Sequence, residues 1–89
     1  MTRYTVVWIQ SAIDALADLW LESADRNAIA KATHEIDREL AEDAPTKGRD
    51  LSEGLRLLSA SPLKVIFSAN EEDRIVEVLV AKIIGQPES

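Results

Sequence analysis

Residues 61 to 84, SPLKVIFSANEEDRIVEVLVAKII, contain two runs in which every second side chain is apolar. The polar stretch NEED, at residues 70 to 73, separates the two runs. Alternation with a period of two is typical of strands, and a polar connection of this length is typical of a hairpin. We therefore predict two antiparallel strands with one wholly apolar face, which must pack against another layer of the protein.

A four-residue loop at residues 70 to 73 sets the predicted register of this hairpin. The register pairs Ala69 with Arg74, Phe67 with Val76, Val65 with Val78, Leu63 with Val80, Ile66 with Glu77, and Lys64 with Leu79. The pairs that contain Phe67, Val65 and Leu63 form the apolar face. The reverse face mixes charged side chains with Ile66, Leu79 and Ile83, and it raises the question of what would contact it.

The first half of the chain supplies a strand and two helices. Residues 3 to 9 alternate β-branched and aromatic side chains, which predicts a strand that lies inside a sheet or under cover. Ser11 is a predicted helix N-cap, and Asp25 is the predicted N-cap of a second helix that reaches about Asp43. The apolar stripes that we expect to face the core are Ile13, Leu16, Ala17 and Trp20 in the first helix, and Ile29, Ala32, Thr33, Ile36 and Leu40 in the second.

Residues 45 to 54 are polar and contain turn residues, so we predict a connecting loop, followed from Leu55 by a further strand. The predicted fold is α+β, with a helix hairpin packed on one face of a small, mainly antiparallel four-stranded sheet, in the order β-α-α-β-β-β. The 89 residues fit a single domain, residues 1–89, and GQPES at residues 85–89 is predicted to be a disordered tail.

Two helices cover only one side of such a sheet, so the other face is open to a partner. The predicted binding residues on this open face are Ile66, Glu77, Leu79, Lys82 and Ile83. Lys64 either holds a phosphate or carboxylate there or pairs diagonally with Glu77 across the strands. Arg56 on the preceding strand joins Lys64 as an anion site only if the turn near residues 61 and 62 puts both side chains on one face.

Composition excludes several classes of function. Sixteen acidic residues against ten basic ones give a net charge of −6, which opposes nonspecific nucleic-acid binding unless a local basic patch exists. The chain has no cysteine and one histidine, so we expect no metal site and no cofactor. Nowhere do 18 apolar residues occur together, so we expect no membrane span and a cytoplasmic location.

Several short stretches carry a resemblance that covers nearly the whole chain. They are Tyr4, Val6 and Trp8 in the first strand, the spacing of Ala12 and Leu16, EGLRLL at residues 53 to 58, PLKVIF at residues 62 to 67, and RIVEVLVA at residues 74 to 81. In this succession the chain resembles the RelE/ParE toxin superfamily of bacterial toxin-antitoxin systems. The resemblance implies a small toxin whose open sheet face is masked by an antitoxin segment. RelE-like members cleave mRNA on the ribosome, and ParE-like members inhibit DNA gyrase.

The resemblance also implies which residues would do chemistry. RelE-like cleavage uses strand-borne Arg and Lys to stabilise the phosphate charge, with further basic or aromatic residues after the last strand. Arg56 and Lys64 occupy the strand positions and are the candidate catalytic residues. The segment AKIIGQPES supplies Lys82 but no Arg, His or Tyr, so a donor for general acid-base catalysis is missing.

Three hypotheses follow from this departure. We favour a RelE/ParE-like toxin that acts mainly by protein binding, with an antitoxin, a second copy or a gyrase-type target on its open face. The second hypothesis is a ribosome-dependent mRNA endonuclease with Arg56 and Lys64 as an anion clamp. The third is a degenerate, non-toxic family member that forms a dimer.

Overall fold

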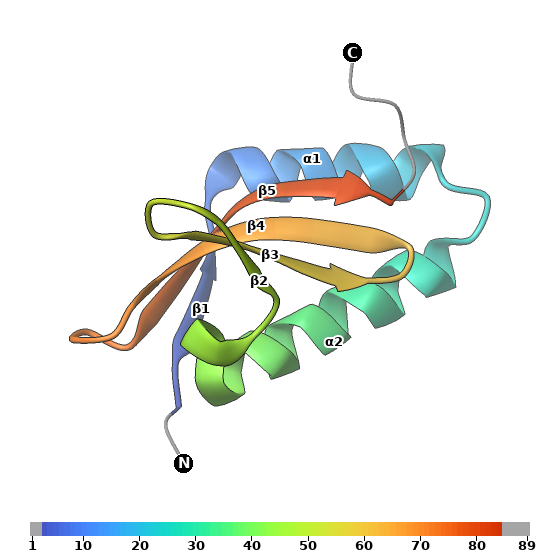
Figure 1. Cartoon of the computed structure of the whole chain (residues 1–89). Helices are drawn as coiled ribbons and strands as arrows, with labels where there is room; N and C mark the ends of the chain where they lie inside the picture. The colour runs from blue at the N-terminus through green and yellow to red at the C-terminus, as the bar shows by residue number, and fades with distance from the viewer. Residues whose placement is uncertain (1–2, 85–89) are drawn as a thin grey trace.

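The computed structural model describes residues 3–84, and the predicted tail at residues 85–89 lies outside them. The helical elements are α1 (Gln10–Glu22), α2 (Arg26–Asp43) and the short 3₁₀ helix η1 (Ala44–Thr46). The strands are β1 (Thr5–Trp8), β2 (Arg49–Ser52), β3 (Leu55–Ala60), β4 (Leu63–Asn70) and β5 (Ile75–Ile83). In Figure 1, α1 runs alongside β5, α2 lies below β3, and the tip of the β4–β5 hairpin projects beyond the rest of the molecule.

The sheet has five strands in the order β1-β5-β4-β3-β2. Strand β1 pairs with β5 in parallel, and the other neighbours pair antiparallel. The predicted α+β class and the mainly antiparallel sheet are confirmed, but the prediction of four strands is wrong, because β2 forms within the segment predicted to be a loop. Strand β1 lies at an edge of the sheet and not inside it. Tyr4, the residue before β1, is buried.

The second helix follows its sequence pattern closely. Asp25 caps it as predicted, since its carboxylate accepts a hydrogen bond from the backbone N–H of Ala28 at 3.1 Å. The first helix begins one residue before the predicted cap, at Gln10, and Ile9 in the N-cap position makes no side-chain capping bond. The cap prediction at Ser11 is therefore wrong.

The first helix is also rotated relative to its predicted stripe. Ala12 is buried, and Leu16 and Leu19 pack against the core, whereas Ile13 is 45% exposed and Trp20 is 39% exposed. Ile13 and Trp20 share one side of α1, because a spacing of seven residues is close to two full helical turns. This side lines the gap between the two helices.

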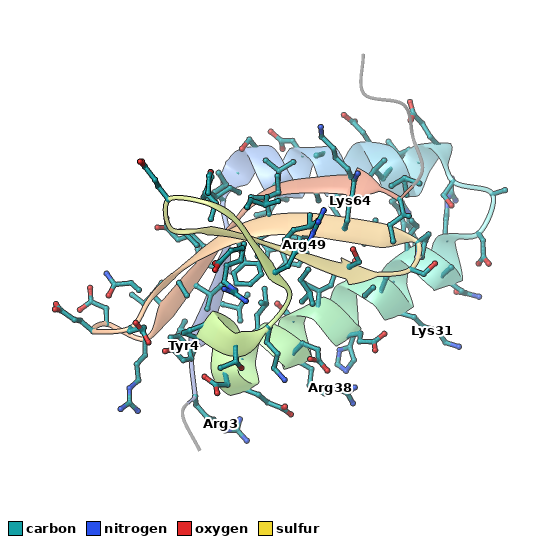
Figure 2. The ribbon with its side chains drawn as sticks, in the orientation of Figure 1. Arg3, Tyr4, Lys31, Arg38, Arg49 and Lys64 are labelled. Carbon is teal, nitrogen blue, oxygen red and sulfur yellow. The ribbon has the colours of Figure 1, made fainter. Side chains whose placement is uncertain are left out.

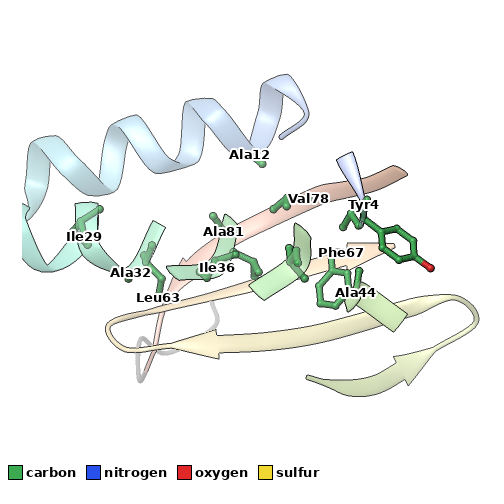
Figure 3. Close-up of a cluster of buried hydrophobic side chains, with 13 residues drawn as sticks. Tyr4, Ala12, Ile29, Ala32, Ile36, Ala44, Leu63, Phe67, Val78 and Ala81 are labelled. Carbon is green, nitrogen blue, oxygen red and sulfur yellow. The ribbon is translucent and has the colours of Figure 1, made fainter. Parts of the chain in front are cut away.

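The hydrophobic core lies between the helix pair and one face of the sheet (Figure 3). On the helix side, α2 buries Ile29, Ala32, Ile36 and Leu40, as its periodicity predicts. On the sheet side, the fully buried side chains are Leu63, Val65, Phe67, Val76 and Val78. Burial at about 25 cal/mol per Å² of apolar surface makes this layer the main source of stability.

A β-bulge on β5 changes the register of the hairpin. Phe67 pairs with Val78 and Ile66 pairs with Val80, so Leu79 is an extra residue without a partner on β4. Because one residue is inserted, the residues after Leu79 exchange faces, and Ala81 turns into the core. The predicted register is wrong by two residues at the loop end and by three beyond the bulge, because β4 extends to Asn70, which pairs with Ile75.

Candidate open-face binding site

The open face of the sheet contains a hollow of about 170 Å³ on the side away from the helices. Four apolar side chains and three cationic side chains surround it: Leu51, Leu57, Ile66 and Val80, with Arg49, Lys64 and Lys82. They come from β2, β3, β4 and β5, and one row of paired residues, Arg49, Leu57, Ile66 and Val80, crosses the sheet. Figure 2 shows Arg49 and Lys64 close together over the sheet, while Lys31 and Arg38 lie on α2.

Lys64 and Lys82 are direct cross-strand partners at the end of this hollow. Like charges in this position destabilise a sheet, because directly opposite side chains have their Cβ atoms only about 5 Å apart. The Lys64 ammonium group makes no hydrogen bond or ion pair with any other side chain in residues 3–84. The hollow therefore concentrates positive charge on a chain whose net charge is −6.

Arg49 reaches the hollow because Gly48 lets β2 approach β3 closely. Gly48 has a φ of 65°, and a Cβ atom at this position would lie 2.0 Å from the carbonyl oxygen of Leu57. Only glycine fits both the left-handed backbone and this approach. The next residue, Arg49, then pairs with Leu57 and places its side chain on the open face.

Arg56 lies on the opposite face of the sheet from Lys64. It pairs with Phe67, which is buried under the helices. Its guanidinium donates to the carbonyl oxygen of Lys47 at 2.8 Å and to Asp50 Oδ1 at 2.6 Å. The predicted clamp of Arg56 with Lys64 is therefore not formed, and Arg56 instead holds the segment before β2 against β3.

The predicted binding residues do not all share one face. Ile66 and Lys82 line the hollow, and Glu77 is exposed on the same face, where it pairs with Ser68. Leu79 is the bulge residue, and Ile83 packs against the core on the helix side, so its predicted place on the open face is wrong. Among the described residues, Lys64 and Glu77 do not form the predicted diagonal pair. The register places Glu77 opposite Ser68, which is four residues along β4 from Lys64.

The chemistry of the hollow is that of an anion site with apolar walls. Among the described residues that line it, none is a His, Tyr, Cys, Asp or Glu. Three cations and four aliphatic side chains suit a carboxylate or phosphate that is attached to an apolar segment. Within residues 3–84, no group of three or more His, Cys, Asp or Glu side chains could hold a metal ion, and no helix is long and apolar enough to cross a membrane.

Comparison of the chain with known proteins finds similar proteins through structure. No protein-family model and no curated protein matches the sequence. The toxin-antitoxin complex RelBE2 of Mycobacterium tuberculosis superposes with a TM-score of 0.79 at 17% identity, over 97% of each chain. The chromosomal ParDE system of Pseudomonas aeruginosa gives 0.69 at 17% identity, over 92% of this chain and 97% of that one. The archaeal RelE–RelB complex of Pyrococcus horikoshii gives 0.67 at 20% identity, over 98% of this chain and all of that one.

The chain has the RelE/ParE toxin fold. Both RelE and ParE proteins are among its structural neighbours, so the fold is common to the two kinds of toxin. Identities of 17–20% mean that the likeness lies in the architecture of the helix pair and the sheet.

In this RelE/ParE fold, sequence reasoning missed four residues of the hollow: Arg49, Leu51, Leu57 and Val80. Arg49 and Leu51 fall in the segment that reads as a loop, where a run of four strand residues is too short to show a period. Leu57 belongs to a strand whose faces the sequence alone did not assign. Val80 follows the bulge, so its face is the reverse of the one that simple alternation predicts.

Proposed function

We propose that this chain is the toxin component of a toxin-antitoxin pair and that it acts by binding a protein partner through its open sheet face. The observation that carries the proposal is the cross-strand pair of Lys64 and Lys82 beside Arg49, in an apolar hollow on a strongly acidic chain. Within residues 3–84 the Lys64 ammonium group has no ion-pair partner, so we interpret this cationic site as one for a partner of opposite charge. The toxin-antitoxin complexes among the structural neighbours support the role.

The hollow also defines the chemistry of the partner. A carboxylate that enters between Lys64 and Arg49 would cancel part of the repulsion between Lys64 and Lys82, and aliphatic neighbours of that carboxylate would cover Leu57, Ile66 and Val80. An antitoxin segment that alternates acidic and aliphatic residues has this chemistry. We also retain the cytoplasm as the proposed location, in keeping with an intracellular target of the toxin.

Induced expression of the chain in a bacterial host tests the proposal. We expect growth arrest, relief of that arrest when the product of the adjacent gene is expressed as well, and co-purification of the two proteins. Lys64→Glu should abolish the co-purification. A chain that neither arrests growth nor binds that product would overturn the proposal and favour a non-toxic family member.

A second candidate function, ribosome-dependent mRNA cleavage, is favoured by the three cations of the hollow. Arg49 and Lys64, rather than Arg56 and Lys64, would then stabilise the charge of the phosphate. Transcript mapping after induced expression tests this function: cleavage that depends on ribosomes and is lost in Arg49→Ala and Lys64→Ala supports it. Intact transcripts together with inhibited DNA supercoiling would point to a gyrase-type target instead.

A further inference from the structure

The helix side of the molecule carries a second apolar surface, which the proposed function does not use. A groove of about 580 Å³ runs between α1 and α2, on the side of the fold opposite the open sheet face. Its walls include Ile13, Leu16 and Trp20 of α1 and Ile29, Ala30 and Thr33 of α2. We call this surface the helix groove.

Apolar side chains along the helix groove are unusually exposed. Ile13 is 45% exposed, Trp20 is 39% exposed and Leu21, the next residue of α1, is 67% exposed. A contiguous apolar patch of this kind on a small protein marks an interaction surface. Trp20 is also held in place, because the Arg26 guanidinium carbon lies 5.8 Å from the centre of its ring and Arg26 Nε donates to its carbonyl oxygen at 3.1 Å. A fixed aromatic ring is a typical anchor of a protein interface.

The outer stripes of the two helices, beside the helix groove, carry opposite charges. Asp37 of α2 lines the groove itself, where its carboxylate accepts a hydrogen bond from the indole N–H of Trp8 at 2.9 Å. Helix α1, with the sequence QSAIDALADLWLE, contains three acidic residues and no basic residue. Asp14 follows the groove residue Ile13, and it lies on the same side of α1 as the exposed Leu21, because the two are seven residues, or nearly two turns, apart. On α2, Lys31 and Arg38 are also seven residues apart and form the outer stripe of that helix, next to His34, which lines the groove.

With one kind of two-fold axis, the charges of one copy face opposite charges of a second copy. A two-fold axis along the groove places α1 of one copy over α2 of the other, so each acidic stripe faces a basic stripe. A two-fold axis across the groove would place acidic α1 over acidic α1 instead. Ile13 and Asp37 both line the groove away from the interhelical turn, so Asp14 and Arg38 lie at nearly the same height along it.

We propose that a second copy of this chain binds in the helix groove and forms a symmetric dimer with a four-helix core. In this dimer Trp20 and Ile13 of each copy are buried against the other, and Asp14 faces the partner's Arg38. The two open sheet faces point away from each other, so each remains available to its own partner. The dimer is independent of the proposed function, since it uses the other side of the fold.

The surface that the dimer would bury is small. Helix α1 has 13 residues and is therefore about 20 Å long, and two helices side by side are about 20 Å wide. Such a contact is smaller than the roughly 800 Å² per partner of a standard stable interface. We therefore expect a dimer whose population depends on protein concentration in the micromolar range.

Sedimentation equilibrium over a range of protein concentrations tests the proposal on the full chain. The unmodified chain should show a monomer–dimer equilibrium, and Trp20→Ala should weaken it on the order of 30-fold, as expected for the loss of a central aromatic anchor. Ile75→Ala is the matched control, because Ile75 is 38% exposed but lies on the open sheet face. Its dissociation constant should be unchanged.

A charge swap distinguishes the proposed geometry from a general loss of structure. Asp14→Arg alone and Arg38→Glu alone should each weaken the dimer, because each variant faces a like charge on the other copy. The double variant Asp14→Arg, Arg38→Glu should restore it, since opposite charges face each other again. A chain that is monomeric at every concentration, a dimer that Ile75→Ala disrupts, or a double variant without recovery would each overturn the proposal.

Discussion

Lys64 on β4 and Lys82 on β5 are direct cross-strand partners on the open face of the sheet. The bulge at Leu79 produces this relationship, because it turns Lys82 from the helix face to the face that carries Lys64. Arg49 joins them from β2, at the other end of the apolar row. An irregularity in one strand thus assembles the site that we propose for the partner.

Replacement of Lys64 should stabilise the free protein. Lys64→Met removes one of two like charges at a direct cross-strand position while it keeps the length of the side chain, so we expect a gain of about 0.2–1 kcal/mol in the free energy of unfolding. Urea denaturation at low salt measures this change. Lys31→Met on the exposed surface of α2 is the control and should alter stability by less than about 0.5 kcal/mol. A loss of stability in Lys64→Met would speak against repulsion in the pair.

Arg56 should behave in the opposite way. Arg56→Met removes the hydrogen bonds to the Lys47 carbonyl and to Asp50, and we expect a loss of about 1.5–3 kcal/mol in the free energy of unfolding. Arg56→Lys should recover only part of this loss, because an ammonium group lacks the planar fork that reaches several acceptors. At temperatures where these variants are folded, partner binding should be retained. Lost binding at unchanged stability would show that Arg56 belongs to the binding site after all.

Two glycines with positive φ should respond differently to alanine. Gly48→Ala introduces a Cβ atom that collides with the Leu57 carbonyl, so β2 must move, and we expect a loss of about 2–4 kcal/mol. Gly54→Ala, at a φ of 76° and with no atom within 4 Å of the new Cβ, should lose only about 1 kcal/mol. Thermal unfolding of the pair measures the difference. Equal losses would contradict the close approach of β2 to β3.

Tyr4 should make the protein sensitive to alkaline pH. Burial raises the pKa of its hydroxyl above the ordinary value of about 10, the charges of Glu71 and Asp43 raise it further, and Arg74 lowers it. The folded state therefore holds the Tyr4 proton more tightly than the unfolded state. This contribution to stability is complete below the unfolded pKa and is lost as pH rises through the folded pKa.

The chain contains one tyrosine, so tyrosinate absorbance reports on Tyr4 alone. In a pH titration the folded protein should ionise at a higher pH than the denatured protein, and Tyr4→Phe should reduce the fall in stability at alkaline pH. Identical titration curves for the folded and denatured chains would refute the prediction.

Periodicity predicted the parts of the fold in which one period runs without interruption. The buried side of α2 and the buried side chains Leu63, Val65 and Phe67 of β4 follow directly from spacings of 3.6 and 2. The bulge could not be read in the same way, because an inserted residue leaves β5 as an almost continuous apolar run. The one signal is that Glu77 and Lys82 are five residues apart. In a regular strand, two polar side chains on one face are separated by an even number of residues.

The candidate site was harder to predict than the fold, for the same reason. Lys64 and Ile66 could be placed on the open face because they lie within the regular part of β4. Arg49 could not, because its position depends on the close contact between Gly48 and Leu57. These two residues lie in different segments, so the period of neither segment reveals the contact. The face of Arg56 depended on the turn between β3 and β4, whose length the sequence leaves open.

The most direct test of the open face as the partner site is the affinity of two charge-reversal variants for the product of the adjacent gene. Lys64→Glu and Lys31→Glu change the same residue type and the same charge, the first on the open face of the sheet and the second on α2 (Figure 2). Calorimetry at a protein concentration below that of self-association should show a loss on the order of 100-fold for Lys64→Glu and an unchanged affinity for Lys31→Glu. Equal affinities of the two variants, or a loss confined to Lys31→Glu, would contradict the placement of the partner on the open sheet face.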